Sequence, residues 1–502
     1  MLVIRNLTSG NVLSERTKIA WLYLIASLFV AISMYLVVRR DVYLSFGFPV
    51  VLGILLLYLF SLDKVILLIS FVVPLSINLE NIDAGLSISL PAEPLLFGVL
   101  IIFLSKLLYE RQYDEKIAKH PISIVIYIML GWMLFTTFTS ELPVVSLKYL
   151  VSRLWFVVPF YFVASLVFKK LSNIHWFIWL YIGSLIIVII YTFIRHASFG
   201  FSEDSAHWVM SPLYNDHTAY GAALAMYLIF SVGYLFYPGL KFNRRLVVGI
   251  FTSVLLLGII LSLSRAAWIS LAGALGVLIV VVLKIKFRWI LLSFTAFLFI
   301  FITFQHEIID MLEKNKQDSS TDLIEHVQSI SNISSDASNL ERINRWQAAF
   351  RLFDERPVLG WGPGTYQFVY GPYQRSKEKT IISTNSGDKG NAHSEYIGPL
   401  SEMGFPGMSI ILILVGTMVY TGIKTYHKAK TKEVKVITIS ATLALVSYFI
   451  HGLLNNFLDT DKLSIPVWGC TAILVVMDVF YADKTEIKSA EKSETSLEAE
   501  KI

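Results

Sequence analysis

Long hydrophobic segments separated by short polar breaks make up most of this chain of 502 residues. A helix needs about 20 apolar residues to cross the roughly 30 Å hydrocarbon core of a bilayer. A shorter segment, 64–78, adds a possible fourteenth crossing to thirteen of about that length. Because lipid cannot satisfy backbone hydrogen bonds and the segments lack strand-like alternation, we expect an all-α polytopic membrane bundle of about 12 to 14 helices. The thirteen segments are 19–38, 43–61, 91–109, 121–138, 147–168, 174–194, 216–237, 244–262, 266–284, 288–304, 396–423, 433–453 and 463–482.

The stretch from Gln305 to Glu402 interrupts this pattern with roughly 85 polar residues, which end in Asn391 to Tyr396 at the start of the next apolar segment. Loops this long are uncommon unless they are functional, and a rigid scaffold commonly positions such loops. We therefore predict that this loop forms one wall of an active site. The chain then divides into a cytoplasmic N-terminus (1–18), a transmembrane bundle (19–304), a large outward loop with an amphipathic helix (305–392), C-terminal transmembrane helices (393–482) and a solvated, disordered cytoplasmic tail (483–502).

The composition supports a membrane protein rather than several soluble domains. Hydrophobic residues make up 55% of the chain and charged residues 16%, against about 25% charged residues in soluble domains. The first 18 residues are too polar for a secretory signal. The net charge of +5 comes from short loops, so no nucleic-acid partner is expected. The single cysteine, Cys470, lies in an apolar segment, which argues against a disulfide or a thiolate-metal site; no cofactor and no metal are expected.

Basic residues in the short breaks predict the orientation, because lysine and arginine concentrate in cytoplasmic loops. Five breaks carry such clusters, and with fourteen spans all five lie on one side. The long loop then faces the opposite side, the periplasm or external face. The clusters are Lys106, Arg111, Lys116 and Lys119; Lys169 and Lys170; Lys241, Arg244 and Arg245; Lys284, Lys286 and Arg288; and Lys424, Lys428, Lys430, Lys432 and Lys435.

Arginines at the outward side are candidates for binding an anionic substrate. Arg265 follows Ser264 where two apolar segments meet almost without a loop. A charge there is costly unless it is paired or solvated, although an interfacial arginine that reaches the headgroups explains it equally well. A predicted amphipathic helix ends before Pro357, and its apolar face comprises Leu340, Ile343, Trp346 or Gln347, Phe350 and Phe353. Its polar side carries Arg342 and Arg345. They contact either lipid phosphates or a substrate phosphate.

A histidine and two glutamates occur where the long loop meets the next span. Histidine is well suited to accept a proton near neutral pH, so His393 is a candidate base, although a lone histidine is often structural. Asn391 is expected to cap a helix that begins beside it. Glu395 and Glu402 are seven residues apart, so they share a helical face and Glu402 is buried, with an arginine as its expected partner.

Two other polar motifs have less specific explanations. The glycines of 357–364 could present backbone N–H groups to phosphate, but no Lys-Ser/Thr pair follows, and turn formation explains them better. Asp459 and Asp461 are spaced like the acidic pair of metal-dependent glycosyltransferases. A short polar loop explains them better than a metal site does.

The order of these motifs resembles the O-antigen ligase and polymerase superfamily of bacterial envelope enzymes. The resemblance covers roughly residues 210 to 460 and rests on four motifs, with a departure at Ser394, where many members have asparagine. It implies a GT-C-like lipid-linked glycan transferase of the bacterial inner membrane with a periplasmic active site. The motifs are 262–268, Arg342 with Trp346, 357–364, and 393–404.

By this resemblance the donor is a glycan on undecaprenyl pyrophosphate, and the acceptor is a hydroxyl of lipid A-core or a related molecule. Arg265 and Arg342, with Arg345 beside them, would bind the pyrophosphate, and His393 would activate the acceptor. Ser264, Glu395 and Glu402 would support the site. The transfer would invert the anomeric centre without a metal. Polysaccharide polymerisation and protein O-glycosylation use the same chemistry, and a transporter or flippase for lipid-linked glycan is the alternative from another class.

Overall fold

The computed structural model describes two units of the chain, which we treat separately. Described residues are 27–35, 38–39, 48–82, 86–286, 288, 292, 295, 303, 337–376, 378–379, 383 and 390–485. The first unit comprises residues 1–65 and contains helix α3 (Phe48–Phe60), within the predicted segment 43–61. The second unit, residues 66–502, contains every candidate site residue. The predicted segments 19–38 and 288–304 and the tail lie largely outside the described residues.

Ten helices in the described part of the chain are long and apolar enough to cross a membrane. Each coincides with one of the predicted segments to within a few residues, which confirms the polytopic all-α fold. They are α5 (Ala92–Glu110), α7 (Pro121–Phe138), α8 (Pro143–Val157) continuing through η3 (Val158–Val163) into α9 (Ala164–Val167), α10 (Leu171–Ser198), α12 (His217–Leu235), α13 (Phe242–Leu261), α14 (Arg265–Val282), α20 (Ile397–Lys428), α21 (Lys432–His451), and α22 (Asp461–Val476) continuing into η5 (Met477–Tyr481). Short helices α6 (Glu115–Ala118) and α11 (Glu203–Ala206) lie in the breaks.

The short segment 64–78 does not form a fourteenth crossing. Helix α4 (Leu62–Val72) and the 3-10 turn η2 (Val73–Leu75) end at Ser76. Together they rise about 21 Å at 1.5 Å per residue, less than the hydrocarbon thickness. Pro74 cannot continue a helical ladder. The chain then forms an antiparallel hairpin of β1 (Ile77–Ile82) and β2 (Leu86–Leu90), which the sequence pattern did not predict.

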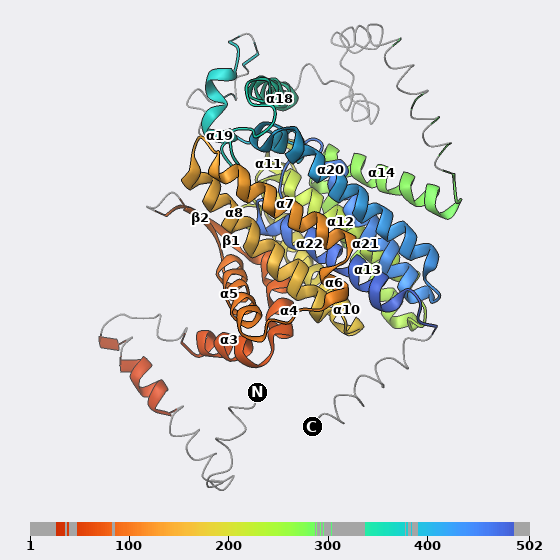
Figure 1. The fold of residues 1–502 in the computed structure, drawn as a ribbon. Helices are drawn as coiled ribbons and strands as arrows, with labels where there is room; N and C mark the ends of the chain where they lie inside the picture. Colours follow the sequence, from red (N-terminus) through yellow and green to blue (C-terminus); the bar gives the residue numbers. More distant parts are fainter. Residues whose placement is uncertain are drawn as a thin grey trace. The chain divides into compact units, whose positions relative to one another are not determined.

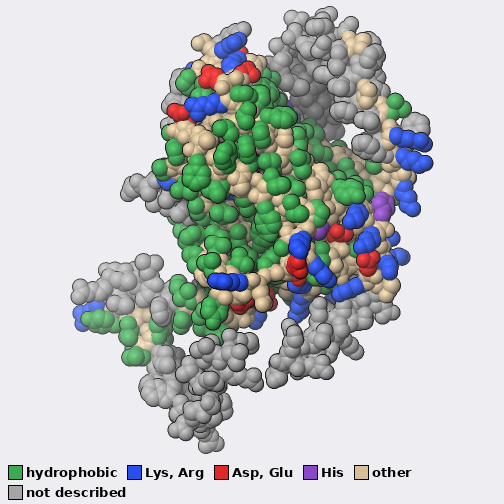
Figure 2. All heavy atoms as spheres, viewed as in Figure 1, with side chains coloured by type: hydrophobic (Ala, Val, Ile, Leu, Met, Phe, Trp, Pro, Cys, Tyr) green, Lys and Arg blue, Asp and Glu red, His purple; other side chains and the backbone are tan. Residues whose placement is uncertain are grey.

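Helices α12, α21 and α22 form the centre of the second unit and are buried along most of their length. Small residues allow the close packing of neighbouring helices. A Cβ added to Gly273 of α14 would collide with Ile450 of α21, and one added to Gly422 of α20 would collide with Thr442 of α21. Figure 2 shows hydrophobic side chains over most of the visible face of the bundle, as expected for a surface in contact with lipid.

Polar contacts gather the predicted cytoplasmic breaks at one end of the bundle. Lys169 pairs with Asp114 at 2.5 Å, and the Tyr481 hydroxyl donates to the carbonyl of Lys169 at 2.6 Å. Lys428 pairs with Asp483 at 2.8 Å. The long loop belongs to the opposite end, where Figure 1 shows helix α18 (Ala337–Glu355) lying over the start of α20.

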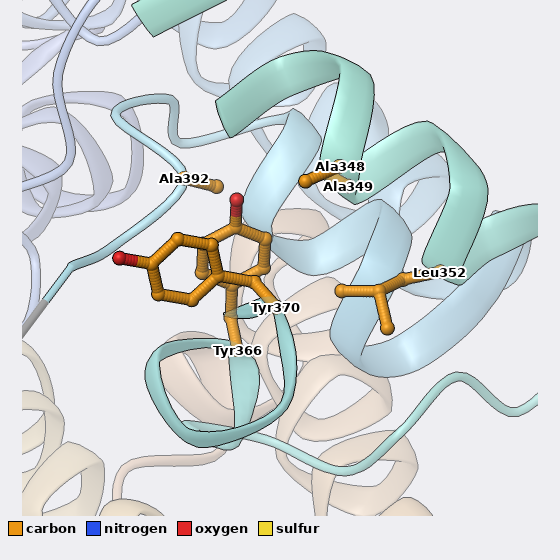
Figure 3. Close-up of a cluster of buried hydrophobic side chains, with 6 residues drawn as sticks. All are labelled: Ala348, Ala349, Leu352, Tyr366, Tyr370 and Ala392. Atoms are coloured by element: carbon orange, nitrogen blue, oxygen red, sulfur yellow. The ribbon is translucent and has the colours of Figure 1, made fainter. Parts of the chain in front are cut away.

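The face of α18 that packs on the protein differs from the predicted apolar face. Ala348, Ala349 and Leu352 pack on Tyr366 of α19 (Tyr366–Val369), and the cluster continues to Tyr370, just before η4 (Gly371–Tyr373), and to Ala392 (Figure 3). Phe350 of the predicted apolar face is 45% exposed. Alanines allow α18 to approach closely, and Glu341, Asn344 and Arg345 are buried on the packed side. The predicted polar side of this helix is therefore partly a protein interface.

Candidate functional site

His393 lies in a tight turn before α20. Its φ of 47° is in the left-handed region, and its backbone N–H donates to Oδ1 of Asn391 at 3.1 Å. Helix α20 begins only at Ile397, so Asn391 stabilises this turn rather than capping a helix beside it. The Ser394 hydroxyl accepts from the N–H groups of Tyr396 and Ile397, each at 3.3 Å. Serine thus provides the capping oxygen that an asparagine could also offer.

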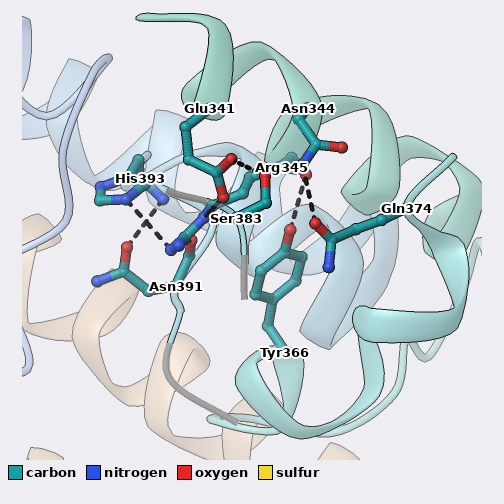
Figure 4. Close-up of polar contacts among 8 residues, drawn as sticks. All are labelled: Glu341, Asn344, Arg345, Tyr366, Gln374, Ser383, Asn391 and His393. Atoms are coloured by element: carbon teal, nitrogen blue, oxygen red, sulfur yellow. Dashed lines mark hydrogen bonds and ion pairs between the residues drawn. The ribbon is translucent and has the colours of Figure 1, made fainter. Parts of the chain in front are cut away.

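Arg345 holds the imidazole of His393. Nη1 of Arg345 lies 3.2 Å from Nε2 of His393 and donates at 3.2 Å to the carbonyl of Asn391. Nε donates to Oε1 of Glu341 at 2.8 Å, and Glu341 also accepts from Ser383 (Figure 4). Since a guanidinium only donates, Nε2 of His393 accepts, and the neutral ring carries its proton on Nδ1.

Buried polar contacts fix the position of Arg345. The Tyr366 hydroxyl donates to the backbone carbonyl of Arg345 at 2.7 Å. The guanidinium carbon of Arg345 lies 5.7 Å from the ring centroid of Tyr370, which is a cation–π distance. Its side chain is 8% exposed and that of Glu341 is 4% exposed. These contacts favour a positioning role for Arg345.

Burial and two cations keep His393 neutral. Burial lowers the pKa of His393 to about 3, and the charges of Arg345 and Arg342 contribute to the lowering. The ring is therefore an uncharged hydrogen-bond acceptor at physiological pH. An anion bound between these arginines would offset their charge and raise the pKa of His393.

Arg342 links α18 to the break that follows α21. Its Nε donates to the carbonyl of Leu454 at 3.1 Å, and Leu454 donates its N–H to the carbonyl of His451 at 3.1 Å. His451 ends α21 and is 1% exposed. Arg342 is thus beside the C-terminal end of α21, close enough to His393 to affect its pKa.

Arg265 is the first residue of α14, at the same end of the bundle. Helix α14 packs along α21, where the hydroxyls of Ser270 and Ser447 lie 2.9 Å apart. Ser264, the N-cap residue, is 1% exposed, and its hydroxyl has no hydrogen-bond partner among the described residues. The structure therefore places Arg265 and Ser264 beside the end of α21 to which Arg342 is linked.

Glu395 and Glu402 do not share a helical face, because Glu395 precedes α20. Oε1 of Glu395 accepts from the Tyr448 hydroxyl at 2.5 Å and from the N–H groups of Phe457 and Leu458 at 2.7 and 2.9 Å. Burial raises the pKa of Glu395. Oε1 of Glu402 accepts from the N–H of Tyr366 at 3.0 Å. No arginine in the described ranges forms an ion pair with Glu402, so the predicted arginine partner is replaced by backbone donors.

Arg153 of α8 is a site residue that the sequence patterns did not reveal. Its guanidinium donates to the carbonyl of Leu458 at 2.5 Å and to the Tyr149 hydroxyl at 2.7 Å. With Glu395 and Glu402 it lines a cavity of about 310 Å³. An arginine within the apolar segment 147–168 was the available signal, since charges inside membrane spans are commonly functional.

The glycine motif forms turns, as predicted. Gly360 and Gly362 have φ of 68° and 109°, and a Cβ on Gly360 would collide with the backbone of Glu402 and Met403. The N–H of Gly362 donates to the carbonyl of Glu402 at 2.8 Å. This N–H therefore binds the backbone of α20 and does not point to a phosphate site. The motif packs where α20 is kinked at Gly404.

Asp459 and Asp461 have different surroundings. Asp461 accepts from the Ser76 hydroxyl at 2.6 Å, whereas Asp459 lines the cavity beside Arg153. The described part of the chain contains no group of three or more histidine, cysteine, aspartate or glutamate side chains arranged to hold a metal. The positions of Asp459 and Asp461 therefore do not support a metal site shared by the two carboxylates.

Comparison with known proteins gives a family match. Residues 248–412 match the model of the family described as O-antigen ligase, whose members are glycosyltransferase-type enzymes. The matched residues include Arg265, Arg342 and His393 and bring together the motifs on which the resemblance rests. A search of curated proteins finds no match. Residues 248–412 thus match an O-antigen ligase domain, and this match supports membership of the chain in the O-antigen ligase superfamily.

Proposed function

We propose that this protein transfers a glycan from undecaprenyl pyrophosphate to a hydroxyl acceptor, such as lipid A-core, at the outer face of the bacterial inner membrane. The observation that carries the proposal is the contact of Arg345 with His393, with Arg342 nearby. It places a neutral imidazole beside cationic groups at the end of the bundle that carries the long loop. A base and an anion-binding group in contact are what this transfer requires.

Arg265 and Arg342 would bind the pyrophosphate. Guanidinium groups contact phosphate oxygens in pairs and stabilise the charge that develops as the pyrophosphate leaves. The N-terminus of α14, where Arg265 lies, also favours an anion. Arg345 would act mainly on His393, with its charge contributing to the binding of the donor.

His393 would accept the proton of the acceptor. The acceptor oxygen attacks the anomeric carbon, the bond from that carbon to the pyrophosphate oxygen breaks, and the pyrophosphate leaves with the electron pair. The hydroxyl proton passes to Nε2 of His393. Before donor binding, Nε2 accepts from Arg345; pyrophosphate would compete for that guanidinium, which would free Nε2 and raise its basicity. A direct displacement of this kind inverts the anomeric centre.

Polymerisation of repeat units and protein O-glycosylation remain alternatives within the same chemistry. The direct test is the surface-glycan profile of a strain that lacks this gene, complemented with the wild type, His393→Ala or His427→Ala. His427 lies at the far end of α20 and serves as the matched control. We expect His393→Ala to behave like the deletion and His427→Ala like the wild type.

The type of defect identifies the reaction. Core lipid without polymer, with polymer left on its carrier, indicates a ligase, whereas core capped by a single repeat indicates a polymerase. Altered glycoproteins with an unchanged core indicate protein glycosylation. Glycan that accumulates on the cytoplasmic side would favour the transporter alternative, and full rescue by His393→Ala would contradict the proposed base.

A further inference from the structure

A cavity beside the His393 turn has no assigned occupant. Its volume of about 310 Å³ is at the lower end of the range for small-molecule sites. Asn391, Ala392 and Ser394 line it, so it adjoins the turn on both sides of His393, whereas Arg265, Arg342 and Arg345 are not among its lining residues. The cavity and the arginines thus contact the turn through different residues.

The charged groups of the cavity differ from those around His393. Three carboxylates, of Glu395, Glu402 and Asp459, line it together with one guanidinium, of Arg153. Both hydrogen bonds of Arg153 go to neutral oxygens, a backbone carbonyl and a tyrosine hydroxyl. A cavity with three acidic groups and one basic group disfavours a pyrophosphate, which the arginines on α18 and α14 favour.

Several polar groups in the cavity are available to a ligand. The Asp459 carboxylate accepts no hydrogen bond from the side chain or N–H of any other described residue. Trp468 is 1% exposed, and its indole N–H has no hydrogen-bond partner within the described ranges. Oδ1 of Asn456 also has no hydrogen-bond partner there. The Asp459 side chain is exposed rather than buried, so its carboxylate can accept hydrogen bonds from the hydroxyls of a bound molecule. The indole N–H and the amide oxygen are buried, and their lack of a partner is costly.

We propose that this cavity binds an uncharged carbohydrate ring of the acceptor, an inference that rests on the proposed function. Sugar hydroxyls can donate to the carboxylates and accept from the guanidinium N–H groups of Arg153. The ring of Tyr149 provides an apolar face that can pack against the sugar. The acceptor would then approach His393 from the cavity, and the donor pyrophosphate would approach it from the arginines.

The test is saturation-transfer NMR on the full chain in lipid nanodiscs, with glucose, galactose and N-acetylglucosamine as neutral probes and glucuronic acid as the anionic probe. We expect signals from at least one neutral sugar and none from glucuronic acid. Asp459→Asn keeps the shape of the side chain and removes its charge, so it should weaken binding by about tenfold. Inorganic pyrophosphate should leave the sugar signal unchanged.

Two further variants make the result specific. Tyr149→Phe, which removes the hydroxyl that accepts from Arg153, should also weaken sugar binding. Glu115→Gln changes a largely exposed carboxylate at the other end of the bundle and should have no effect. Absence of any neutral-sugar signal, equal signals from glucuronic acid, or displacement by pyrophosphate would overturn the inference. Sugar binding needs no turnover, so its failure is distinct from a failure of glycan transfer.

Discussion

Nη1 of Arg345 lies 3.2 Å from Nε2 of His393, and the same guanidinium donates through Nε to Glu341 at 2.8 Å. This arrangement connects the basic nitrogen of the imidazole to a buried ion pair. The position and the protonation of His393 therefore depend on the same arginine. Both properties can be tested separately.

Replacing Arg345 should affect both stability and transfer. Arg345→Gln breaks the buried ion pair with Glu341, and breaking a buried pair from one side typically costs about 3 to 5 kcal/mol. It also removes the donor to His393, so we expect transfer to fall by at least about tenfold. Thermal unfolding in detergent and transfer by the folded fraction measure the two effects.

Arg351→Gln is the matched control for this variant. Arg351 also lies on α18 and pairs with Glu378 at 2.6 Å, but its side chain is 22% exposed. We expect a loss of less than about 1 kcal/mol and near-normal transfer. Equal losses in the two variants would mean that Arg345 has no special relation to His393.

The pH dependence should show a depressed pKa for His393. The folded pKa of about 3 lies below the value of about 6.5 for an unfolded chain. The unfolded state then binds more protons between these values, so the stabilising contribution is complete above pH 6.5 and is lost as the pH falls toward 3. The stability of the wild type relative to His393→Asn should decline over that window.

The activity of the free enzyme should follow the same pKa. We expect kcat/KM to show no inflection from His393 between pH 5 and 8. Arg345→Gln should shift the inflection upward from its acid position, while burial still holds the pKa of His393 below its ordinary value. An inflection near pH 6.5 in the wild type that His393→Asn removes would contradict the neutral state.

Gly360 should not tolerate a side chain. Its φ of 68° and the collision of an added Cβ with the Glu402 backbone predict that Gly360→Ala lowers the unfolding temperature and transfer together. Gly276→Ala in α14 is the control, since a Cβ there meets nothing within 4 Å. If Gly360→Ala behaves like Gly276→Ala, the turn does not hold α20.

Chelation should leave transfer largely intact. If arginines stabilise the leaving pyrophosphate, EDTA has no essential ion to remove, and initial rates should stay within about twofold. Loss of activity that Mg²⁺ restores would return Asp459 and Asp461 to consideration as metal ligands. The assay is transfer in nanodiscs before and after EDTA treatment and dialysis.

Hydropathy predicted the bundle because lipid requires long apolar helices. The ten described spans follow from runs such as 121–138 and 433–453, and Pro74 explains why 64–78 ends early. Because successive spans cross the membrane in opposite directions, the order of the spans also predicted that Arg265 and His393 lie at the same end of the bundle. Local sequence patterns were sufficient for these features.

The contacts of the site depend on packing that local patterns do not determine. Glu402 was expected to pair with an arginine, but its carboxylate accepts from the backbone N–H of Tyr366 instead, a residue that only the packing of the loop on α20 brings near. Arg345 was assigned to the polar side of α18, yet Ala348 and Ala349 allow that side to pack closely on the loop. Arg153 is more than 200 residues from Glu395 along the chain, and only the fold brings them to one cavity.

The measurement that tests the central claim most directly is single-turnover transfer from a purified undecaprenyl-pyrophosphate-linked glycan, at saturating donor, by the wild type and His393→Ala. Loss of general base catalysis predicts a rate lower by about 100-fold or more, with donor affinity nearly unchanged. The same variant should fold and insert like the wild type. Transfer by His393→Ala at the wild-type rate would contradict the account.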